Sequence, residues 1–395
     1  MKKIFGLILL MFFLVNIENS NAQENRWTGS WATAPEFTGK GDMPASSLSN
    51  RSVRNIVHIS FAGSPMRLKL SNEFSSQPVE INAVYIADAL GDSWQTNVKT
   101  SRCLNFDGKK KVTIPAGKTV WSDPLKYNLK SGQRLAITVC YGAQTPINAT
   151  SHRGSRTTSY IIDGTAKAKS SFDNSEKVEH WYNISAIDVM SSNIPVVAVL
   201  GNSITDGRGT TTNKQNRWTD FMSDALNKEN QYGVLNLGIG GNCVLRGGIS
   251  QPALQRFDRD ILSQNGVTKL IIFEGTNDIG CSKGNSEQIA NELIEAYQTL
   301  AAKAKAKGIK VYGATITPFK GNGWYSIFHE AARQTVNEWI RNSKCFDGIV
   351  DFDALVRDPS DVEKLRSEYS SDWLHLNAAG YEVMGRYAAN IIKEK

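Results

Sequence analysis

Four short segments in the second half of the chain carry the residue types of an acyl-transfer site. In chain order they are Gly201–Ile204, Asn236–Gly241, Gly275–Asp278 and Asp372–His375. They contain a serine hydroxyl that can attack a carbonyl carbon and a histidine with a carboxylate three residues before it. They also contain N–H donors that can stabilise negative charge on the carbonyl oxygen. Each segment alone is a weak signal, and the prediction depends on their occurring together and in order.

Ser203 is the candidate nucleophile, because it follows an apolar run and lies in a turn bracketed by glycines. A serine hydroxyl attacks efficiently only when a neighbouring base removes its proton. His375 is the candidate base, since Asp372 precedes it at a spacing that lets the carboxylate reach Nδ1–H. The structural alternatives are a serine that caps a helix and an Asp-x-x-His helix cap.

The other four histidines of the chain are His58, His152, His180 and His329. His58 alternates within a strand pattern and His329 falls on a helical stretch, so both are expected to serve packing. The segment His152–Gly154 is a candidate loop that reaches the site.

Three N–H groups are candidates for holding the oxyanion: the backbone amides of Ser203 and Gly241, and the side-chain amide of Asn277. Glycine lets the main chain approach a substrate closely, and asparagine is a neutral donor. The spacing from Asn236 favours Gly241 over Gly240. The alternatives are a flexible turn or phosphate loop, although GxGxxG and Walker spacings are missing, and an Asx turn at Asn277.

The elements that position these segments alternate between strands and helices after residue 193. Strands are expected at 195–200, 233–237, 269–273, 311–316 and 349–352, and helices around 217–229, 253–263, 286–307, 326–343 and 378–393. This alternation predicts a parallel, doubly wound sheet, in which ligands bind beyond the carboxyl ends of the strands. The first three segments directly follow expected strands, and the fourth lies in a loop before the last helix.

The first half of the chain has the pattern of short strands separated by turns. Met66–Leu70 and Val112–Ile114 alternate apolar and polar residues, and Leu135–Val139 is largely apolar. Many short strands without helical stretches predict a β-sandwich of the jelly-roll kind. The chain of 395 residues also exceeds what one core usually serves. We therefore expect a β-sandwich accessory domain at 23–190 and a catalytic domain at 191–395.

Residues 1–22 have the pattern of a signal peptide. Lys2 and Lys3 precede the apolar run Ile4–Val15, and small residues at positions −3 and −1 predict cleavage after Ala22. The alternative is an uncleaved anchor helix, for which the apolar run is short. No cysteine follows the cleavage point, which argues against a lipid anchor. The mature protein is expected to be soluble and secreted or periplasmic, without stable membrane insertion.

The net charge of +7 is spread along the chain. Lys109–Lys111 falls in an expected turn, and Lys303, Lys305 and Lys307 fall at the end of a helix, where cations are favoured. Basic residues do not interleave with aromatic ones, so nucleic acid is not an expected partner.

Five cysteines in an exported chain leave one without a partner; they are Cys103, Cys140, Cys243, Cys281 and Cys345. Cys243 and Cys281 follow the second and third segments and are candidates for a pair near the site rim, and Cys345 would then be left over. Buried free thiols are the alternative for Cys243 and Cys281, and equally for Cys103 and Cys140. No CxxC or His-Cys cluster indicates a structural metal.

The four segments resemble the conserved blocks of the SGNH (GDSL-type) hydrolase family. The resemblance covers most of the C-terminal half and implies a flavodoxin-like three-layer α/β/α domain. It makes Ser203 the nucleophile, Gly241 and Asn277 oxyanion donors, and Asp372 and His375 the rest of a triad, with no metal or cofactor.

The first half also carries a less specific resemblance. Trp27–Trp31 and Leu70–Asn72 are similar to a β-domain of some secreted bacterial members. The chain departs from the family at Asn202, where the first block usually has aspartate. The triad does not need that aspartate, although hydrogen bonding in the loop must differ.

These observations predict an exported serine esterase that hydrolyses acyl esters, acetyl esters foremost, through an acyl-enzyme on Ser203. Export, a second β-domain and abundant tryptophans favour an acetylated polysaccharide or oligosaccharide as substrate. The tryptophans in question, which can equally be core or interface residues, are Trp27, Trp31, Trp94, Trp181, Trp324 and Trp373. The alternatives are a lipase or arylesterase on short-chain lipid or aryl esters and a non-catalytic glycan-binding protein. The oligomeric state is left open.

Overall fold

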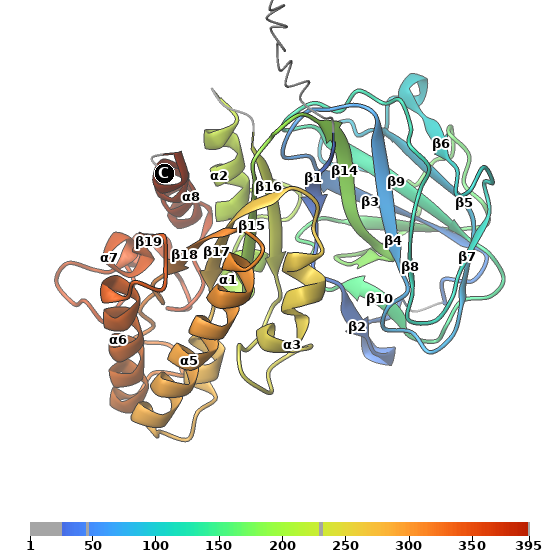
Figure 1. Cartoon of the computed structure of the whole chain (residues 1–395). Helices are drawn as coiled ribbons and strands as arrows, with labels where there is room; N and C mark the ends of the chain where they lie inside the picture. The colour runs from blue at the N-terminus through green and yellow to red at the C-terminus, as the bar shows by residue number, and fades with distance from the viewer. Residues whose placement is uncertain (1–25, 45–46, 229–231, 394–395) are drawn as a thin grey trace, which may run out of the picture.

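The structure, a computed structural model, describes residues 26–44, 47–228 and 232–393. The expected signal peptide and its cleavage point lie outside these residues. An antiparallel β region and an α/β region lie side by side in Figure 1. Among the described residues, no helix combines the length and apolar character needed to cross a membrane.

Fourteen strands make up the described part of the β region. They are β1 (Arg26–Ala32), β2 (Glu36–Thr38), β3 (Arg51–His58), β4 (Met66–Ser71), β5 (Val79–Asp88), β6 (Arg102–Leu104), β7 (Val112–Ile114), β8 (Thr119–Trp121), β9 (Arg134–Tyr141), β10 (Ala149–His152), β11 (Ser159–Asp163), β12 (Glu176–Val178), β13 (Trp181–Tyr182) and β14 (Ile184–Ser191). Short 3-10 helices lie at η1 (Lys40–Asp42) and η2 (Val98–Thr100). One sheet has the order β12-β11-β3-β9-β5-β6, with β7 also paired to β5. A second has the order β1-β14-β4-β8 and a small third has β13-β10-β2.

The first two sheets enclose the core of the β region. Leu68 and Leu70 on β4 are fully buried in one cluster with Val57 on β3 and Ile137 on β9. Arg67 and Lys69, which alternate with the two leucines, are only partly buried, as period-2 alternation requires. The prediction of an all-β region built from short alternating strands is therefore confirmed.

The second half forms one five-stranded parallel sheet. Its strands are β15 (Val196–Gly201), β16 (Gly233–Gly238), β17 (Val267–Phe273), β18 (Lys310–Ala314) and β19 (Gly348–Val350). Their order across the sheet is β16-β15-β17-β18-β19. Counted from the first strand of the half this order is 2-1-3-4-5, the flavodoxin-like order. The predicted parallel, doubly wound sheet is confirmed, and each expected strand is present within a few residues.

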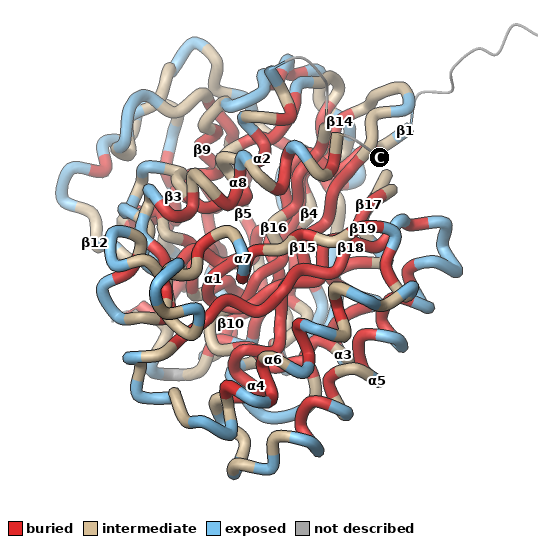
Figure 2. Tube along the Cα trace, turned by 90° about the vertical axis from the view of Figure 1, so that its left-hand side faces the viewer, coloured by how far each residue is buried: buried red, intermediate tan, exposed pale blue. Residues whose placement is uncertain are grey.

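Helices cover both faces of this sheet. They are α1 (Ser203–Asp206), α2 (Trp218–Leu226), α3 (Ala253–Phe257), α4 (Thr276–Gly280), α5 (Ser286–Lys305), α6 (Ile327–Asn342), α7 (Phe352–Val356) and α8 (Ala378–Lys393), with a π-helical turn η3 (Asp258–Leu262) and a 3-10 turn η4 (Ser367–Tyr369). Leu200 packs with α3, α5 and α6, whereas Val199 packs with α2, α7 and α8. The buried strands of the sheet run between the partly exposed helices in Figure 2, which gives three layers.

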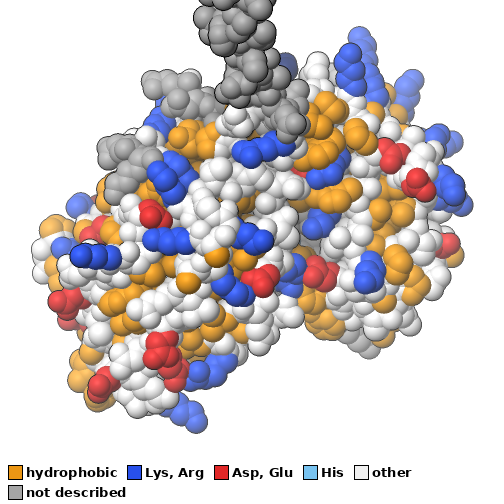
Figure 3. All heavy atoms as spheres, in the orientation of Figure 1, with side chains coloured by type: hydrophobic (Ala, Val, Ile, Leu, Met, Phe, Trp, Pro, Cys, Tyr) orange, Lys and Arg blue, Asp and Glu red, His pale blue; other side chains and the backbone are white. Residues whose placement is uncertain are grey.

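The predicted helices of this half are present with two differences. The segment expected as one helix over 253–263 is α3 followed by the π-helical turn η3. The helix expected over 217–229 ends at Leu226, and residue 229 lies outside the described residues. On the face drawn in Figure 3, Lys and Arg side chains are scattered among acidic ones and do not gather in one stripe.

Candidate active site

Ser203 lies where the first strand of the parallel sheet ends. Strand β15 stops at Gly201, and Asn202 caps helix α1 by accepting a hydrogen bond from the backbone N–H of Ile204 at 3.1 Å. Ser203 is the first residue of that helix, where backbone N–H groups have no acceptor within the helix. Asparagine caps helices as well as aspartate does, so the departure at Asn202 keeps this turn intact.

Ser203, His375 and Asp372 form a continuous hydrogen-bonded series. The Oγ of Ser203 lies 2.8 Å from Nε2 of His375, and Nδ1 of His375 lies 2.7 Å from Oδ2 of Asp372. The other carboxylate oxygen accepts the backbone N–H groups of Leu374 and His375 at 3.0 and 2.8 Å. These bonds hold the carboxylate so that Nδ1 carries the proton and Nε2 faces the serine.

Burial lowers the pKa of His375 below its ordinary value of 6.5, although the hydrogen bond to Asp372 raises it in part. The pKa of Asp372 is also lowered: burial raises it, but the hydrogen bonds from His375 outweigh that effect. The histidine is therefore neutral and the aspartate ionised near pH 7. A neutral imidazole with a free Nε2 is the form that can accept the proton of a serine hydroxyl.

Ser203, Gly241 and Asn277 line the same pocket. Gly241 has a φ of 70°, in the left-handed region that glycine enters without strain. The side-chain amide of Asn277 donates one hydrogen bond to the backbone carbonyl of Asn242 at 2.6 Å. Since an amide carries two N–H donors, this bond orients the group and leaves a second donor.

One arginine that the motifs do not reveal ties these segments together. Arg256 on α3 is fully buried and donates to the backbone carbonyls of Gly201 and Leu237 at 3.1 and 2.8 Å. It also donates to Oδ1 of Asn242 at 2.9 Å. A single guanidinium thus links the ends of β15 and β16 to the loop that follows Gly241. The signal in the sequence is a charged residue on the apolar stripe of the helix expected at 253–263.

The loop after Gly241 is also held by Asp278 on helix α4, which follows strand β17. The carboxylate of Asp278 accepts the backbone N–H groups of Val244 and Leu245 at 2.8 and 3.0 Å. Burial raises the pKa of Asp278 to about 6, and these two hydrogen bonds act in the opposite direction. The candidate oxyanion donors at Gly241 and Asn277 therefore belong to one hydrogen-bonded unit.

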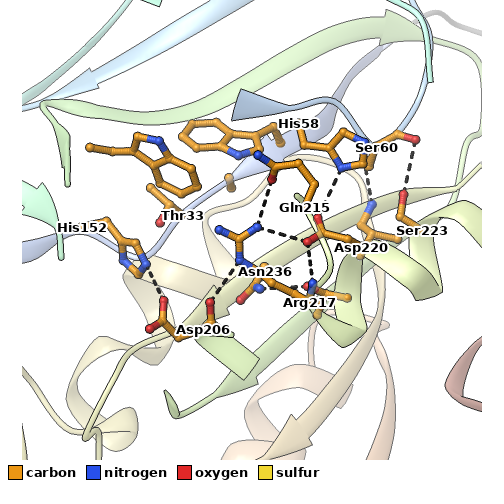
Figure 4. Close-up of a pocket in the computed structure, with 15 residues that line it drawn as sticks. Thr33, His58, Ser60, His152, Asp206, Gln215, Arg217, Asp220, Ser223 and Asn236 are labelled. Carbon is orange, nitrogen blue, oxygen red and sulfur yellow. Dashed lines mark hydrogen bonds and ion pairs between the residues drawn. The ribbon is translucent and has the colours of Figure 1, made fainter. Parts of the chain in front are cut away.

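The β region fixes the far end of helix α1 through Asp206. One carboxylate oxygen of Asp206 lies 2.9 Å from Nε2 of His152, and the other accepts a hydrogen bond from Arg156. Nδ1 of His152 lies 3.0 Å from the backbone carbonyl of Ala34. Figure 4 shows the His152 ring pointing at Asp206 across the boundary between the two regions. The structure thus places the expected loop His152–Gly154 beside helix α1, which begins at Ser203.

Arg217 completes this contact from the catalytic side. Its guanidinium is buried and donates to the backbone carbonyl of Asp206 at 3.1 Å and to that of Ser155. Burial by itself lowers the pKa of His152, but the hydrogen bond and charge of Asp206 outweigh this and raise it. His152 and Asp206 therefore form a buried polar contact between the two regions, and Asp206 favours the protonated form of the imidazole.

Two other histidines differ from their expected packing roles. His58 lies 3.3 Å from the carboxylate of Asp220 and forms a second polar contact across the boundary, visible in Figure 4. Nδ1 of His329 lies 2.6 Å from the backbone carbonyl of Trp324. Both side chains are held by polar partners, which a strand or helix pattern does not reveal.

All five cysteines are free thiols. The pair considered for Cys243 and Cys281 is absent, although both residues line a pocket of about 590 Å³ beside the oxyanion loop. Within the described ranges, no group of three or more His, Cys, Asp or Glu side chains is arranged to hold a metal ion.

A pocket of about 480 Å³ opens over Ser203 and His375. The α/β region supplies its apolar lining, which includes Ile249, Trp324 and Leu374. The β region supplies a second wall, formed by Glu36, Asp42, Arg153, Gly154, Arg156 and His180. We call these six residues the β wall.

The second half of the chain is similar to proteins of a known family. Residues 199–383 match the model of the GDSL-like lipase/acylhydrolase family. No curated protein matches the chain. Solved structures that are similar include a GDSL-like lipase from Bacteroides thetaiotaomicron VPI-5482, with 22% identity over 50% of this chain and 86% of that chain and a TM-score of 0.37. Another is a carbohydrate acetylesterase family member from Sinorhizobium meliloti, with 14% identity over 51% of this chain and 98% of that chain and a TM-score of 0.41. The segment 199–383 belongs to the GDSL-like lipase/acylhydrolase family of carboxylic ester hydrolases.

Proposed function

We propose that this protein is an exported serine esterase that removes acetyl groups from carbohydrate through an acyl-enzyme on Ser203. The observation that carries the proposal is the hydrogen-bonded series from Ser203 through His375 to Asp372, at 2.8 and 2.7 Å. It ends in the 480 Å³ pocket that also contains the three candidate oxyanion donors.

In the first half-reaction, Nε2 of His375 removes the proton from Ser203 as Oγ attacks the ester carbonyl carbon. The oxygen that becomes negative is held by the backbone N–H groups of Ser203 and Gly241 and by the amide of Asn277. His375 then gives its proton to the leaving alcohol oxygen as the bond to the carbonyl carbon breaks. Asp372 stays ionised and stabilises the imidazolium.

In the second half-reaction, water attacks the acyl-enzyme by the same route. His375 removes a proton from the water, the oxyanion donors hold the second tetrahedral intermediate, and the proton returns to Oγ of Ser203. The products are a carboxylic acid and free enzyme.

The lining near Gly241 supports a small acyl group. A Cβ built at Gly241 would lie 2.7 Å from Cδ1 of Ile249, so the isoleucine side chain already occupies the space beside this donor. An acyl group whose carbonyl oxygen is held by Gly241 would therefore contact the apolar side chain of Ile249 directly. Acetyl, the smallest common acyl group with an apolar end, fits this surrounding.

The catalytic part of the proposal is tested with Ser203→Ala. The variant is expected to lose hydrolysis of 4-nitrophenyl acetate and labelling by a fluorophosphonate probe, while its circular dichroism spectrum stays that of the parent. Wild-type turnover by Ser203→Ala would exclude Ser203 as nucleophile. A folded parent protein that the probe does not label would favour a binding protein on the same scaffold.

The substrate part is tested by comparing acetate release from defined acetylated oligosaccharides with hydrolysis of long-chain acyl esters. Faster hydrolysis of the long-chain esters would exclude the carbohydrate proposal and favour a lipase. Export is tested by N-terminal sequencing of the mature protein, which is expected to begin at Gln23.

A further inference from the structure

The pocket over Ser203 has two chemically different sides. Apart from Gly154, every residue of the β wall is charged or polar. The α/β region contributes the exposed side chains of Ile249 and Trp324, and also charged groups such as Arg208. All apolar side chains of the lining therefore come from the α/β region, whereas the side chains from the β region are polar.

His180 differs from the rest of the β wall because its polar atoms lack partners. Both ring nitrogens are buried, and neither has a hydrogen-bond partner among the described residues. The ring stacks on Tyr182, with centroids 5.7 Å apart and planes 7° apart. The hydroxyl of Tyr182 is itself fixed, since it donates to the backbone carbonyl of Asp42 at 2.9 Å. His180 is thus held in place by stacking and keeps its hydrogen-bonding capacity unused.

The charged members of the β wall are already paired. Arg153 donates two hydrogen bonds to Oε1 of Glu36, at 3.2 and 2.6 Å, and Arg156 donates to Asp206. The Nε of Arg156, like the nitrogens of His180, is buried without a partner among the described residues. Buried polar atoms without partners cost free energy in the empty protein, so a ligand that satisfies them gains affinity.

The β wall and the proposed catalytic base share one pocket, because Arg153, Arg156 and His180 line it together with His375. The oxygen of the leaving alcohol must approach Nε2 of His375, because it receives its proton there. The carbonyl oxygen of the acyl group would be held near Gly241, which Ile249 approaches closely.

We propose that the β wall is the binding subsite for the leaving alcohol and that His180 recognises hydroxyl groups of a polyhydroxylated alcohol such as a sugar. This inference rests on the proposed esterase activity. A neutral imidazole has one donor and one acceptor nitrogen, and a hydroxyl group is both a donor and an acceptor. A pair of neighbouring sugar hydroxyls therefore satisfies both nitrogens, whereas an aryl leaving group offers no hydroxyl for them.

The test is His180→Phe, which keeps a ring to stack on Tyr182 and removes both nitrogens. The measured quantity is the ratio of kcat/KM for a mono-acetylated methyl glycoside to kcat/KM for 4-nitrophenyl acetate. We expect this ratio to fall about tenfold, the effect of losing one or two neutral hydrogen bonds. His180→Asn restores a donor and an acceptor and is expected to recover part of the ratio.

The matched control is Lys177→Ala, which changes an exposed residue on neighbouring strand β12 and is expected to leave the ratio unchanged. Thermal unfolding gives an independent readout. A binding role predicts an unchanged or higher Tm for His180→Phe, since unsatisfied polar atoms are removed. A lower Tm, or equal losses on both substrates, would overturn the inference. Failure of the esterase proposal itself would appear separately, as full activity of Ser203→Ala on both substrates.

Discussion

Gly154→Ala is the sharpest perturbation of the contact between the β region and the nucleophile helix. A Cβ at this position would lie 2.1 Å from Oδ2 and 2.2 Å from Oδ1 of Asp206. The backbone of Gly154 is outside the left-handed region, so alanine introduces no backbone strain of its own. The effect of the substitution therefore comes only from the close contact between the added Cβ and the carboxylate of Asp206.

The size of the effect follows from the geometry. Ordinary contact begins at 3.4 Å, so the carboxylate must retreat by at least about 1.3 Å, the difference between 3.4 and 2.1 Å. That movement breaks the 2.9 Å contact with His152 and displaces α1, which begins at Ser203. Overpacking of this kind costs about 1–3 kcal/mol of stability. A displacement of about 1 Å at a reacting group costs about 100-fold in rate.

We therefore expect Gly154→Ala to lower the free energy of unfolding by about 1–3 kcal/mol and kcat for 4-nitrophenyl acetate by about 10- to 100-fold. Urea unfolding and steady-state kinetics measure the two quantities. The matched control is Gly41→Ala in the same region, where an added Cβ meets no atom within 4 Å. Loss of stability with unchanged kcat would refute the coupling between this contact and Ser203.

Three further predictions concern the base, the oxyanion and the buried contact between His152 and Asp206. Burial lowers the pKa of His375, so kcat/KM is expected to fall as the pH drops through a midpoint below 6.5; an acid limb centred above pH 7 in the pH-rate profile would contradict this. Asn277→Ala is expected to lower kcat by about 10²–10³ with an unchanged circular dichroism spectrum, and an unchanged rate would make Asn277 structural. The pKa of His152 is raised above 6.5 in the folded state, because the hydrogen bond and charge of Asp206 outweigh the effect of burial. Its stabilisation is therefore complete below pH 6.5 and lost as the pH rises through the folded-state pKa. The Tm difference between the wild type and His152→Gln should shrink over that range, and a constant difference would argue against a protonated His152.

Local patterns in the sequence were sufficient to predict the architecture of the second half. Because parallel strands are buried on both faces, they appear in the sequence as runs of apolar residues. In the amphipathic helices between them, apolar residues recur every three to four positions. The first three segments could be assigned to the carboxyl edge of the sheet because the same patterns show where each strand ends. The short helices α1 and α4 could not be predicted, since four or five residues are too few to show a period.

The polar contacts that position the site were not predictable from the sequence. His152 and Asp206 are separated by 54 positions, and Arg256 and Gly201 by 55. Periodicity in the sequence indicates whether a residue is buried, but it does not indicate which polar group that residue contacts. The sequence could not single out His180, because its significance lies in ring nitrogens that have no hydrogen-bond partner among the described residues.

The partners of Asp206 have a consequence for how this enzyme can be divided or recombined. Its carboxylate lies in the α/β half, whereas the side chains that contact it, His152 and Arg156, both come from the β region. A catalytic half grafted onto a different β-domain would keep a buried aspartate three positions after its nucleophile and lose the cations that neutralise it. The architecture changes at the junction between Ser191 and Val196, but these contacts cross it, so we expect the α/β half expressed alone to be less stable than the whole chain.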